Sequence, residues 1–421
     1  FTDGTLAATG ALTNLPTIAA NNTVDISAGG SFGDATTLDG GTLQTAAFGM
    51  SNLTFTSGTL ETSGSLTNLN TLGAGQAVII DGASATWSPT GDIDAGTTTI
   101  QNSGTLSVSN LDATNLTFTD GTLNASGSLT NYSSAANQTL NLNAGGSWDA
   151  GDTPNFGGTV NLSGGALSVA AFDASQLASF SSGTLNAAGT LTNYTSAASQ
   201  TLNLNSGGVW DAGDNPTFNG SVNLSGGSLS VAAFDASQLA SFTSGTLNAS
   251  GALTNYSSAA SQTLNLNAGG AWDAGDNPTF DGTVNLSGGS LDVQSFDADQ
   301  LASFSSGTLG ITGTLTNLNT LSANQTILLD GGTWSPSGSI DAGNTTIQNS
   351  AILSVGDLDA TNLTFTDGTL NASGALANYT NAANQTLNLN ADGAWDAGDN
   401  PTFDGTVNLT GGSLTVQTFD A

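Results

Sequence analysis

One stretch of about 62 residues is repeated seven times along this chain, a period typical of repeat proteins. The copies occupy residues 1–54, 55–117, 118–179, 180–241, 242–303, 304–364 and 365–421. Such repetition indicates a repeat architecture, because one unit buries its apolar face only by stacking on its neighbours. We therefore predict a single continuous repeat domain over residues 1–421, and we expect the array to continue in a longer protein.

Each repeat divides into three similar pieces of about 20 residues, which is the length of one unit in the shorter solenoid repeats. In the fourth copy, Leu202 and Leu204, then Val222 and Leu224, alternate with polar residues between turn-forming pairs such as Gly-Gly and Asn-Pro. This alternation predicts short strands, and no segment has helical spacing. A propeller and a parallel β-solenoid both fit many short strands. A propeller blade needs four antiparallel strands, so three similar pieces per repeat favour the solenoid.

The predicted fold is all-β, a right-handed parallel β-helix (β-solenoid) of roughly 20 coils. Each coil is expected to take about 20 residues, with three coils in each repeat of about 62 residues. The handedness follows from the crossover rule for parallel strands. At about 4.8 Å between paired strands, such a solenoid is a rod on the order of 100 Å long.

The composition excludes several classes of function. Lysine, arginine, histidine and cysteine are absent, whereas 32 acidic residues give a formal net charge of −32. The usual general bases, imidazole ligands and thiolate nucleophiles are therefore missing, and we predict that the chain is not an enzyme. Nucleic-acid binding is excluded because it requires cationic side chains. Membrane insertion is not expected, because no apolar run approaches the roughly 18 residues of a span.

All tryptophans occupy one position of the repeat. They are Trp87, Trp148, Trp210, Trp272, Trp334 and Trp395. We interpret them as core residues beneath a turn, and the alternative is a surface stripe that stacks against sugars. Three coils between successive tryptophans would separate them by about 14 Å, which is too sparse for a continuous binding stripe.

Aspartates follow four of the tryptophans in the motif W-D-A-G-D. They are Asp149 and Asp152, Asp211 and Asp214, Asp273 and Asp276, and Asp396 and Asp399. Carboxylates and turn carbonyls are the ligands that Ca²⁺ prefers, so these eight residues are candidate Ca²⁺ ligands. Their spacing matches neither the EF-hand nor the calcium-binding nonapeptide, and Asp is also an ordinary turn former. We predict no required cofactor, with Ca²⁺ as the candidate ion.

Gly-Thr-Leu, Gly-Gly-Ser-Leu and Asn-Leu-Ser-Gly-Gly recur at coil spacing. In these motifs the chain resembles the large secreted β-solenoids of bacteria, such as autotransporter passengers and filamentous-haemagglutinin-type adhesins. It departs from them in having no basic residue at all. The resemblance implies an extracellular or cell-surface location.

Two functions fit these observations. The first is a structural protein that forms a rigid rod, stalk, sheath or filament, with end-to-end or lateral self-association and cation-bridged contacts. The second is a cell-surface adhesin that binds glycans or other surface polymers with the help of Ca²⁺. Uniform repeats favour the first, because an adhesive site is usually an irregular insertion in one coil.

Overall fold

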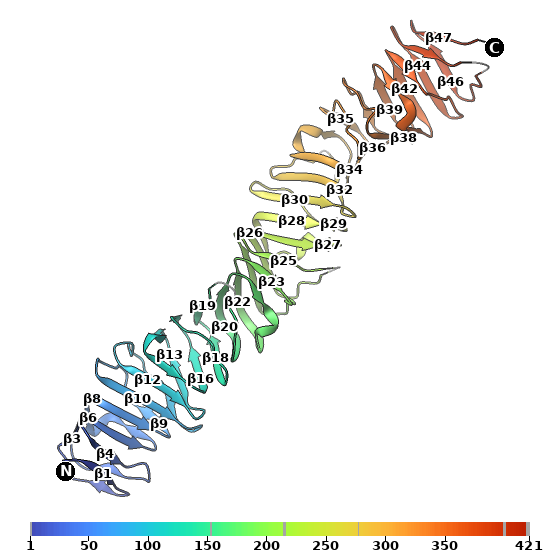
Figure 1. Cartoon of the computed structure of the whole chain (residues 1–421). Helices are drawn as coiled ribbons and strands as arrows, with labels where there is room; N and C mark the ends of the chain where they lie inside the picture. Colours follow the sequence, from blue (N-terminus) through green and yellow to red (C-terminus); the bar gives the residue numbers. More distant parts are fainter. Residues whose placement is uncertain (1, 152–153, 214–215, 277, 399–400, 418–421) are drawn as a thin grey trace. The chain divides into compact units, whose positions relative to one another are not determined.

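The computed structural model describes residues 2–151, 154–213, 216–276, 278–398 and 401–417. The chain divides into two compact units. Unit 1 is Phe1–Val209 with Phe218–Asn223, and unit 2 is Trp210–Thr217 with Leu224–Ala421. In both units the described residues form short parallel strands and single 3-10 turns, without an α-helix (Figure 1). The predicted all-β parallel solenoid is confirmed, with about 22 coils.

The ladders of unit 1 run from coil to coil. One sheet contains β1 (Gly4–Ala7), β3 (Thr17–Ala19), β4 (Asn22–Asp25), β6 (Thr36–Thr45), β8 (Leu53–Thr62), β10 (Gln76–Asp81), β12 (Thr97–Gln101) and β15 (Leu116–Phe118). The other strands are β2 (Ala11–Leu12), β5 (Ser31–Phe32), β7 (Phe48–Gly49), β9 (Ser65–Thr67), β11 (Thr86–Trp87), β13 (Thr105–Val108), β14 (Leu111–Asp112), β16 (Gly121–Ala125), β17 (Ser128–Thr130), β18 (Gln138–Asn143), β19 (Ser147–Asp149), β20 (Thr159–Val169), β21 (Phe172–Asp173), β22 (Ser179–Ala187), β23 (Thr190–Thr192) and β24 (Gln200–Asn205).

Unit 2 is built in the same way. Its strands are β27 (Phe234–Asp235), β28 (Ser241–Ala249), β29 (Ala252–Thr254), β30 (Gln262–Asn267), β31 (Ala271–Gly275), β32 (Thr283–Val293), β33 (Phe296–Asp297), β34 (Ser303–Ile311), β35 (Thr314–Thr316), β36 (Gln325–Asp330), β37 (Thr333–Trp334), β38 (Asn344–Gln348), β39 (Ile352–Val355), β40 (Leu358–Asp359), β41 (Leu363–Phe365), β42 (Gly368–Ala372), β43 (Ala375–Ala377), β44 (Gln385–Leu389), β45 (Ala394–Asp396), β46 (Thr406–Leu409) and β47 (Ser413–Thr415). Strands β25 (Val209–Asp211) and β26 (Ser221–Val231) include residues of both units.

Single 3-10 turns recur once in each of the first six repeats, after a two-residue strand. They are η1 (Met50–Asn52), η2 (Ala113–Asn115), η3 (Ala174–Gln176), η4 (Ala236–Gln238), η5 (Ala298–Gln300) and η6 (Ala360–Asn362). Among the described residues there is no helix capable of crossing a membrane.

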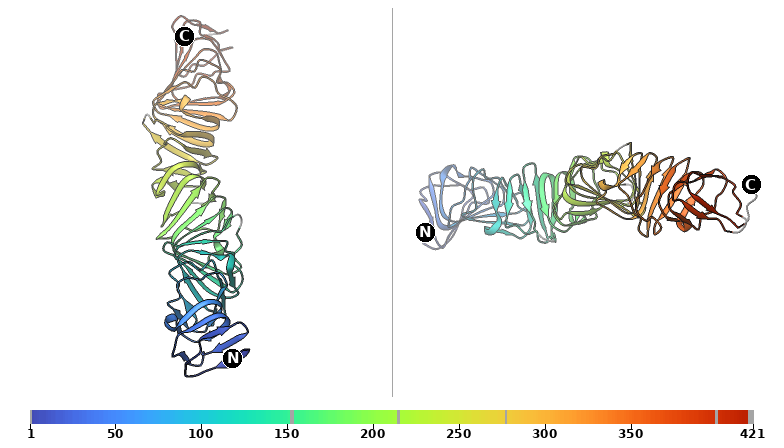
Figure 2. Two further views of the ribbon diagram at one scale, coloured as in Figure 1. Left: turned by 90° about the vertical axis from the view of Figure 1, so that its left-hand side faces the viewer. Right: turned by 90° about the horizontal axis from the view of Figure 1, so that it is seen from above.

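A coil of unit 2 has three sides. Strands β38, β39 and β40 form three successive sides, and β41 returns to the first side by pairing with β38. Strands β38, β39 and β40 belong to three different sheets, so each side of the coil is formed by its own sheet. The stacking of these coils is visible from two further directions in Figure 2.

Coils are shorter than expected, with a spacing of about 18 residues per turn. In unit 2, an unbroken series of register partners leads from Phe296 to Val407 in six coils. The predicted coil was therefore slightly too long. A repeat makes slightly more than three coils, so each new repeat begins one side further round the coil.

The tryptophans of unit 2 demonstrate this shift. Trp272 pairs with Leu291 of β32, Trp334 with Leu353 of β39, and Trp395 with Leu376 of β43. These three columns lie in three different sheets. The same residue of the repeat therefore appears on a different side in each successive copy.

Inward side chains form the core beneath these sheets. Leu123, Leu140 and Val160 occupy successive coils and are fully buried, because alternate residues of a strand point to one face. All six tryptophans are at most 5% exposed, which confirms the prediction that they fill the core.

Other aromatic rings pack on both sides of the tryptophan in some repeats. In one stack, adjacent ring centroids are 5.1–6.3 Å apart, the range favoured by aromatic pairs. Its members are Phe118, Tyr132, Trp148, Phe156 and Phe172. The sequence spacing of the tryptophans alone did not reveal this stack, because Phe and Tyr fill the intervening positions.

A buried glutamine joins this aromatic corner to the preceding coil. The Gln262 Oε1 accepts hydrogen bonds from the Ala259 N–H (3.2 Å) and the Tyr256 hydroxyl (3.3 Å), and its Nε2 donates to the Phe242 carbonyl. Burial raises the pKa of Tyr256 to about 12. The same hydrogen bonds recur at Gln138, Gln200 and Gln385.

Candidate functional site

The first aspartate of each W-D-A-G-D motif closes a turn. Asp149, Asp211, Asp273 and Asp396 each accept the N–H of the glycine two residues later, at 2.9–3.0 Å. These glycines have φ near +70°, a conformation that favours glycine, and the carboxylate satisfies the turn backbone. Of the second aspartates, Asp152, Asp214 and Asp399 lie outside the described residues, whereas Asp276 is described.

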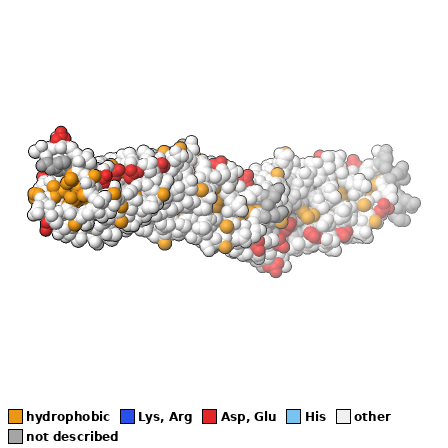
Figure 3. All heavy atoms as spheres, turned by 90° about the horizontal axis from the view of Figure 1, so that it is seen from below, with side chains coloured by type: hydrophobic (Ala, Val, Ile, Leu, Met, Phe, Trp, Pro, Cys, Tyr) orange, Lys and Arg blue, Asp and Glu red, His pale blue; other side chains and the backbone are white. Residues whose placement is uncertain are grey.

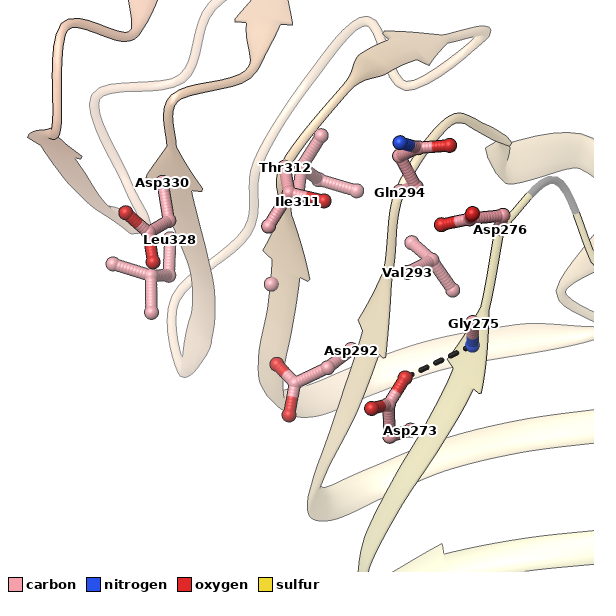
Figure 4. Close-up of a pocket in the computed structure, with 11 residues that line it drawn as sticks. Asp273, Gly275, Asp276, Asp292, Val293, Gln294, Ile311, Thr312, Leu328 and Asp330 are labelled. Atoms are coloured by element: carbon pink, nitrogen blue, oxygen red, sulfur yellow. Dashed lines mark hydrogen bonds between the residues drawn. The ribbon is translucent and has the colours of Figure 1, made fainter.

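Asp273 and Asp276 line a hollow of about 520 Å³ within unit 2. Asp292 of β32 and Asp330 of β36 line it as well. Figure 4 shows Asp273 and Asp292 on neighbouring strands, with Asp276 and Asp330 on opposite sides. Asp273 and Asp292 are register partners in the ladder. Partial burial, followed by the charge of Asp273, raises the pKa of Asp292.

A glycine accounts for the space in this hollow. Gly310 of β34 occupies the position taken by Asn186, Asn248 and Asn371 in other repeats. A Cβ at Gly310 would collide with a carboxylate oxygen of Asp292. The missing side chain at residue 310 therefore leaves room for the Asp292 carboxylate.

The predicted Ca²⁺ ligands are only partly brought together. Asp273 and Asp276 share the hollow, but in the described part of the chain no three acidic side chains gather closely enough to hold a metal ion. Asp149, Asp211 and Asp396 belong to separate copies of the turn. Calcium binding at the eight residues named from the sequence therefore stays a prediction.

A second set of aspartates caps the 3-10 turns. Asp235 accepts the Ser237 N–H and the Asn255 Nδ2 of the next coil, both at 2.9 Å. The equivalent carboxylates are Asp112, Asp173, Asp297 and Asp359. Hydrogen bonds from the following Ser or Thr hydroxyl, the Asn amide and the backbone lower the pKa of Asp112, Asp173, Asp235 and Asp359. These aspartates act as turn formers, the alternative to Ca²⁺ binding that the sequence analysis left open for Asp, and their hydrogen bond to the Asn of the next coil was not predicted.

Asparagines on the outer surface of the strands form ladders. In unit 1 the Asn141 Nδ2 donates to the Asn124 Oδ1 at 2.7 Å, and the Asn161 Nδ2 donates to the Asn141 Oδ1 at 2.8 Å. A column of hydroxyl side chains, which is threonine at every rung except Ser221, lies two residues before each ladder on the same face of the sheet. We call each ladder with its hydroxyl column an amide face.

The described residues form four amide faces. Their asparagines are Asn124, Asn141 and Asn161; Asn186, Asn203 and Asn223; Asn248, Asn265 and Asn285; and Asn371, Asn388 and Asn408. The first two faces belong to unit 1 and the other two to unit 2. Alternation of Leu and Asn in Q-T-L-N-L-N was the available signal, but only the strand register shows that the amides meet.

The acidic side chains lie mainly on parts of the surface outside the amide faces. Of the strands that carry the ladder asparagines, only β32 contains an acidic residue, Asp292, which lies beyond the bulge that follows Asn285, in a chain that contains 32 acidic residues. Figure 3 shows acidic side chains in scattered groups, with uncharged surface between them and no basic side chain. The amide faces are therefore the polar but uncharged part of a strongly acidic molecule.

No family model matches the chain, and no curated protein matches it. Among solved structures it is matched with the crystal structure of a TibC-catalysed, hyper-glycosylated TibA55-350 fragment, at 15% sequence identity. The match covers 99% of this chain and 98% of that chain, with a TM-score of 0.10. A likeness with a TM-score this low carries no argument about fold or function.

Proposed function

We propose that this chain is a non-enzymatic structural solenoid displayed outside the cell. The observation that supports this proposal is the uniformity of the coils. The five repeats from residue 55 to residue 364 each use a buried Leu column, a buried Trp and a capping Asp in stacking coil on coil. Catalytic His, Lys, Arg and Cys are absent from the sequence. Stacking gives the chain stiffness, which is what a stalk or sheath requires.

This proposal requires the chain to be a rigid rod. The test is negative-stain electron microscopy of the purified chain, combined with small-angle scattering. We expect straight particles on the order of 100 Å long, from about 22 coils at roughly 4.8 Å. Two bodies joined at variable angles would contradict a rigid rod.

Location and self-association are tested on native material. Antibody labelling of intact cells of the source organism should detect the chain at the surface, and labelling that requires permeabilised cells would contradict surface display.

Self-association is tested by electron microscopy of native material with Ca²⁺ and then with a chelator. Filaments or lateral bundles that disperse on chelation would establish cation-bridged assembly. Single rods both with Ca²⁺ and with chelator would exclude self-association by this segment.

A second candidate function is adhesion to surface glycans. The uncharged amide faces favour it, because they present hydrogen-bonding groups without the repulsion of 32 carboxylates. The two functions are compatible, since a rod can carry binding faces. Binding of isolated, monomeric rods to a glycan would distinguish adhesion from a purely structural role.

A further inference from the structure

The amide faces have hydrogen-bonding capacity that the fold does not use. A side-chain amide has two N–H donors and a carbonyl oxygen with two lone pairs. Within its ladder, Asn141 uses one donor toward Asn124 and accepts one hydrogen bond from Asn161. One N–H and one lone pair therefore remain for a ligand at this rung. Asn265 has the same pair of ladder hydrogen bonds in unit 2, with Asn248 and Asn285.

Hydroxyls lie beside these amides at a regular spacing. Thr122, Thr139 and Thr159 are register partners in three successive strands. Neighbouring rungs in such a ladder lie about 4.8 Å apart, and the next outward column lies two residues along the strand. The face therefore offers rows of hydroxyl and amide groups held by a rigid sheet, so little conformational entropy is lost when they bind a ligand.

Charge decides what kind of polymer can approach. A second copy of this chain carries 32 negative charges and no positive one, so copies repel each other at low ionic strength. Nucleic acids and anionic polysaccharides are repelled for the same reason. An uncharged polymer meets no such barrier, and a polymer rich in hydroxyls can both donate to and accept from the free amide groups.

We propose that the amide faces bind a neutral, hydroxyl-rich polysaccharide. This inference gives a ligand class to the adhesive function proposed above and rests on that function. Binding replaces water on the free N–H groups, carbonyl oxygens and hydroxyls with sugar hydroxyls along a single column of coils. Because no ion pair is formed, the affinity is insensitive to salt.

The test is retention of the purified chain on immobilised cellulose, chitin, mannan and dextran, with heparin and alginate as anionic polymers. One variant replaces the central asparagine of every ladder by Asp: Asn141, Asn203, Asn265 and Asn388. A matched control adds the same charge at exposed left-handed turns: Asn21→Asp, Asn137→Asp, Asn324→Asp and Asn384→Asp. Asp tolerates this conformation, so the control keeps its fold.

We expect retention on at least one neutral polymer, unchanged between low and high salt. The ladder variant should lose about tenfold in affinity and the control variant almost nothing, because a lost rung hydrogen bond and a misplaced charge cost about 1.4 kcal/mol or more. If the ladder variant does not fold, Thr139→Val, Thr201→Val, Thr263→Val and Thr386→Val remove hydroxyls while the amide ladders remain. These variants should weaken retention as well.

Three outcomes would overturn the proposal. They are no retention on any neutral polymer, equal retention of the ladder and control variants, and retention only on anionic polymers. Sedimentation velocity on the same samples separates a further outcome, self-association through these faces, which would also overturn it. None of these results bears on whether electron microscopy shows a rod, so the structural function is tested independently.

Discussion

Two adjacent repeats of unit 2 have the same core but different outer faces. In repeat 242–303 the outward column of the strands contains Asn248, Asn265 and Asn285, joined by amide hydrogen bonds. In repeat 304–364 the column beginning at Asp292 continues through Gly310 and Leu328. The inward-facing residues that alternate with these outward residues along the same strands are buried. The comparison teaches that stacking constrains only the inward positions, so the outward positions are free to carry different chemistry.

The contacts of the buried tryptophan also differ between two repeats. In repeat 118–179 Trp148 stacks on Tyr132, with centroids 5.1 Å apart. Repeat 55–117 has no tyrosine, and the Trp87 Nε1 donates instead to the Leu69 carbonyl at 2.8 Å. A ring contact in one repeat thus replaces a hydrogen bond in the other.

The largest expected effect comes from removing these tryptophans. Trp87→Ala and Trp148→Ala should each cost about 3–5 kcal/mol of unfolding free energy, because each leaves a large cavity. Trp87→Phe should cost about 1–3 kcal/mol more than Trp148→Phe, since it leaves the buried Leu69 carbonyl without its donor. Urea unfolding of the four variants measures this difference. Equal losses of unfolding free energy in the two Phe variants would show that the hydrogen bond from Trp87 to the Leu69 carbonyl adds no net stability.

The buried glutamines should rank next. Gln262→Leu removes the partner of the Ala259 N–H and of the Phe242 carbonyl and one partner of the Tyr256 hydroxyl, whereas Gln325→Leu affects only two backbone groups. Each unsatisfied buried group costs about 1–3 kcal/mol, so Gln262→Leu should be the more damaging. Thermal unfolding provides the comparison. Tyr256→Phe is the control for the hydroxyl alone, and a Gln325→Leu variant at least as unstable as Gln262→Leu would contradict this ranking.

A smaller effect is expected from restoring the ladder in repeat 304–364. Gly310→Asn alone should destabilise by at most about 1 kcal/mol, because its Cβ meets the Asp292 carboxylate, which ends an exposed side chain and must rotate away. Asp292→Ser removes that carboxylate and supplies the hydroxyl found at the equivalent Ser230. The unfolding free energy of the double variant should therefore be about 1 kcal/mol higher than the sum of the two single effects predicts. A double-mutant cycle in urea measures the coupling, and strict additivity would argue against the collision.

The smallest effects concern pH, and two aspartates of unit 2 should respond in opposite directions. Folding lowers the pKa of Asp235, so the folded state binds fewer protons and stability rises with pH. The stabilisation by Asp235 is present above its unfolded pKa of about 3.9 and is lost as the pH falls through the folded pKa. Asp235→Asn should therefore lower the melting temperature at pH 7 and have little effect near pH 2.

Asp292 should show the reverse. Its pKa is raised by burial and by the charge of Asp273, so ionising it opposes folding as the pH rises through the folded pKa. Asp292→Asn should raise the melting temperature at pH 7, with the gain vanishing below pH about 4. Melting temperatures of both variants from pH 2 to 7 check the two signs. Parallel pH curves would refute the assigned environments.

The fold class could be predicted because its signals are local and repeated. Leu202 and Leu204 alternate with polar residues, and the same alternation returns in every copy, so chance patterns are averaged out. The burial of the tryptophans followed from the same periodicity. Coil length could not be obtained in this way, because the sequence does not reveal which residues of neighbouring coils become register partners.

The candidate site was predicted less completely. Asp273 and Asp276 do share a hollow, but the first aspartate of the motif also closes a turn through the Gly275 N–H. Asp235 has a capping role that depends on Asn255 of the next coil. Composition shows how many carboxylates are present, but it cannot show which of them accept hydrogen bonds from a neighbouring coil.

By itself, the sequence determined that this protein is a parallel stack of short strands with buried tryptophans and an acidic surface. Those properties depend on residue type and on spacing within one repeat. Only the tertiary structure decided the exact coil length, the shift of successive repeats from side to side, and the meeting of asparagines in ladders. These properties depend on pairing between coils, where residues 17–21 positions apart become neighbours.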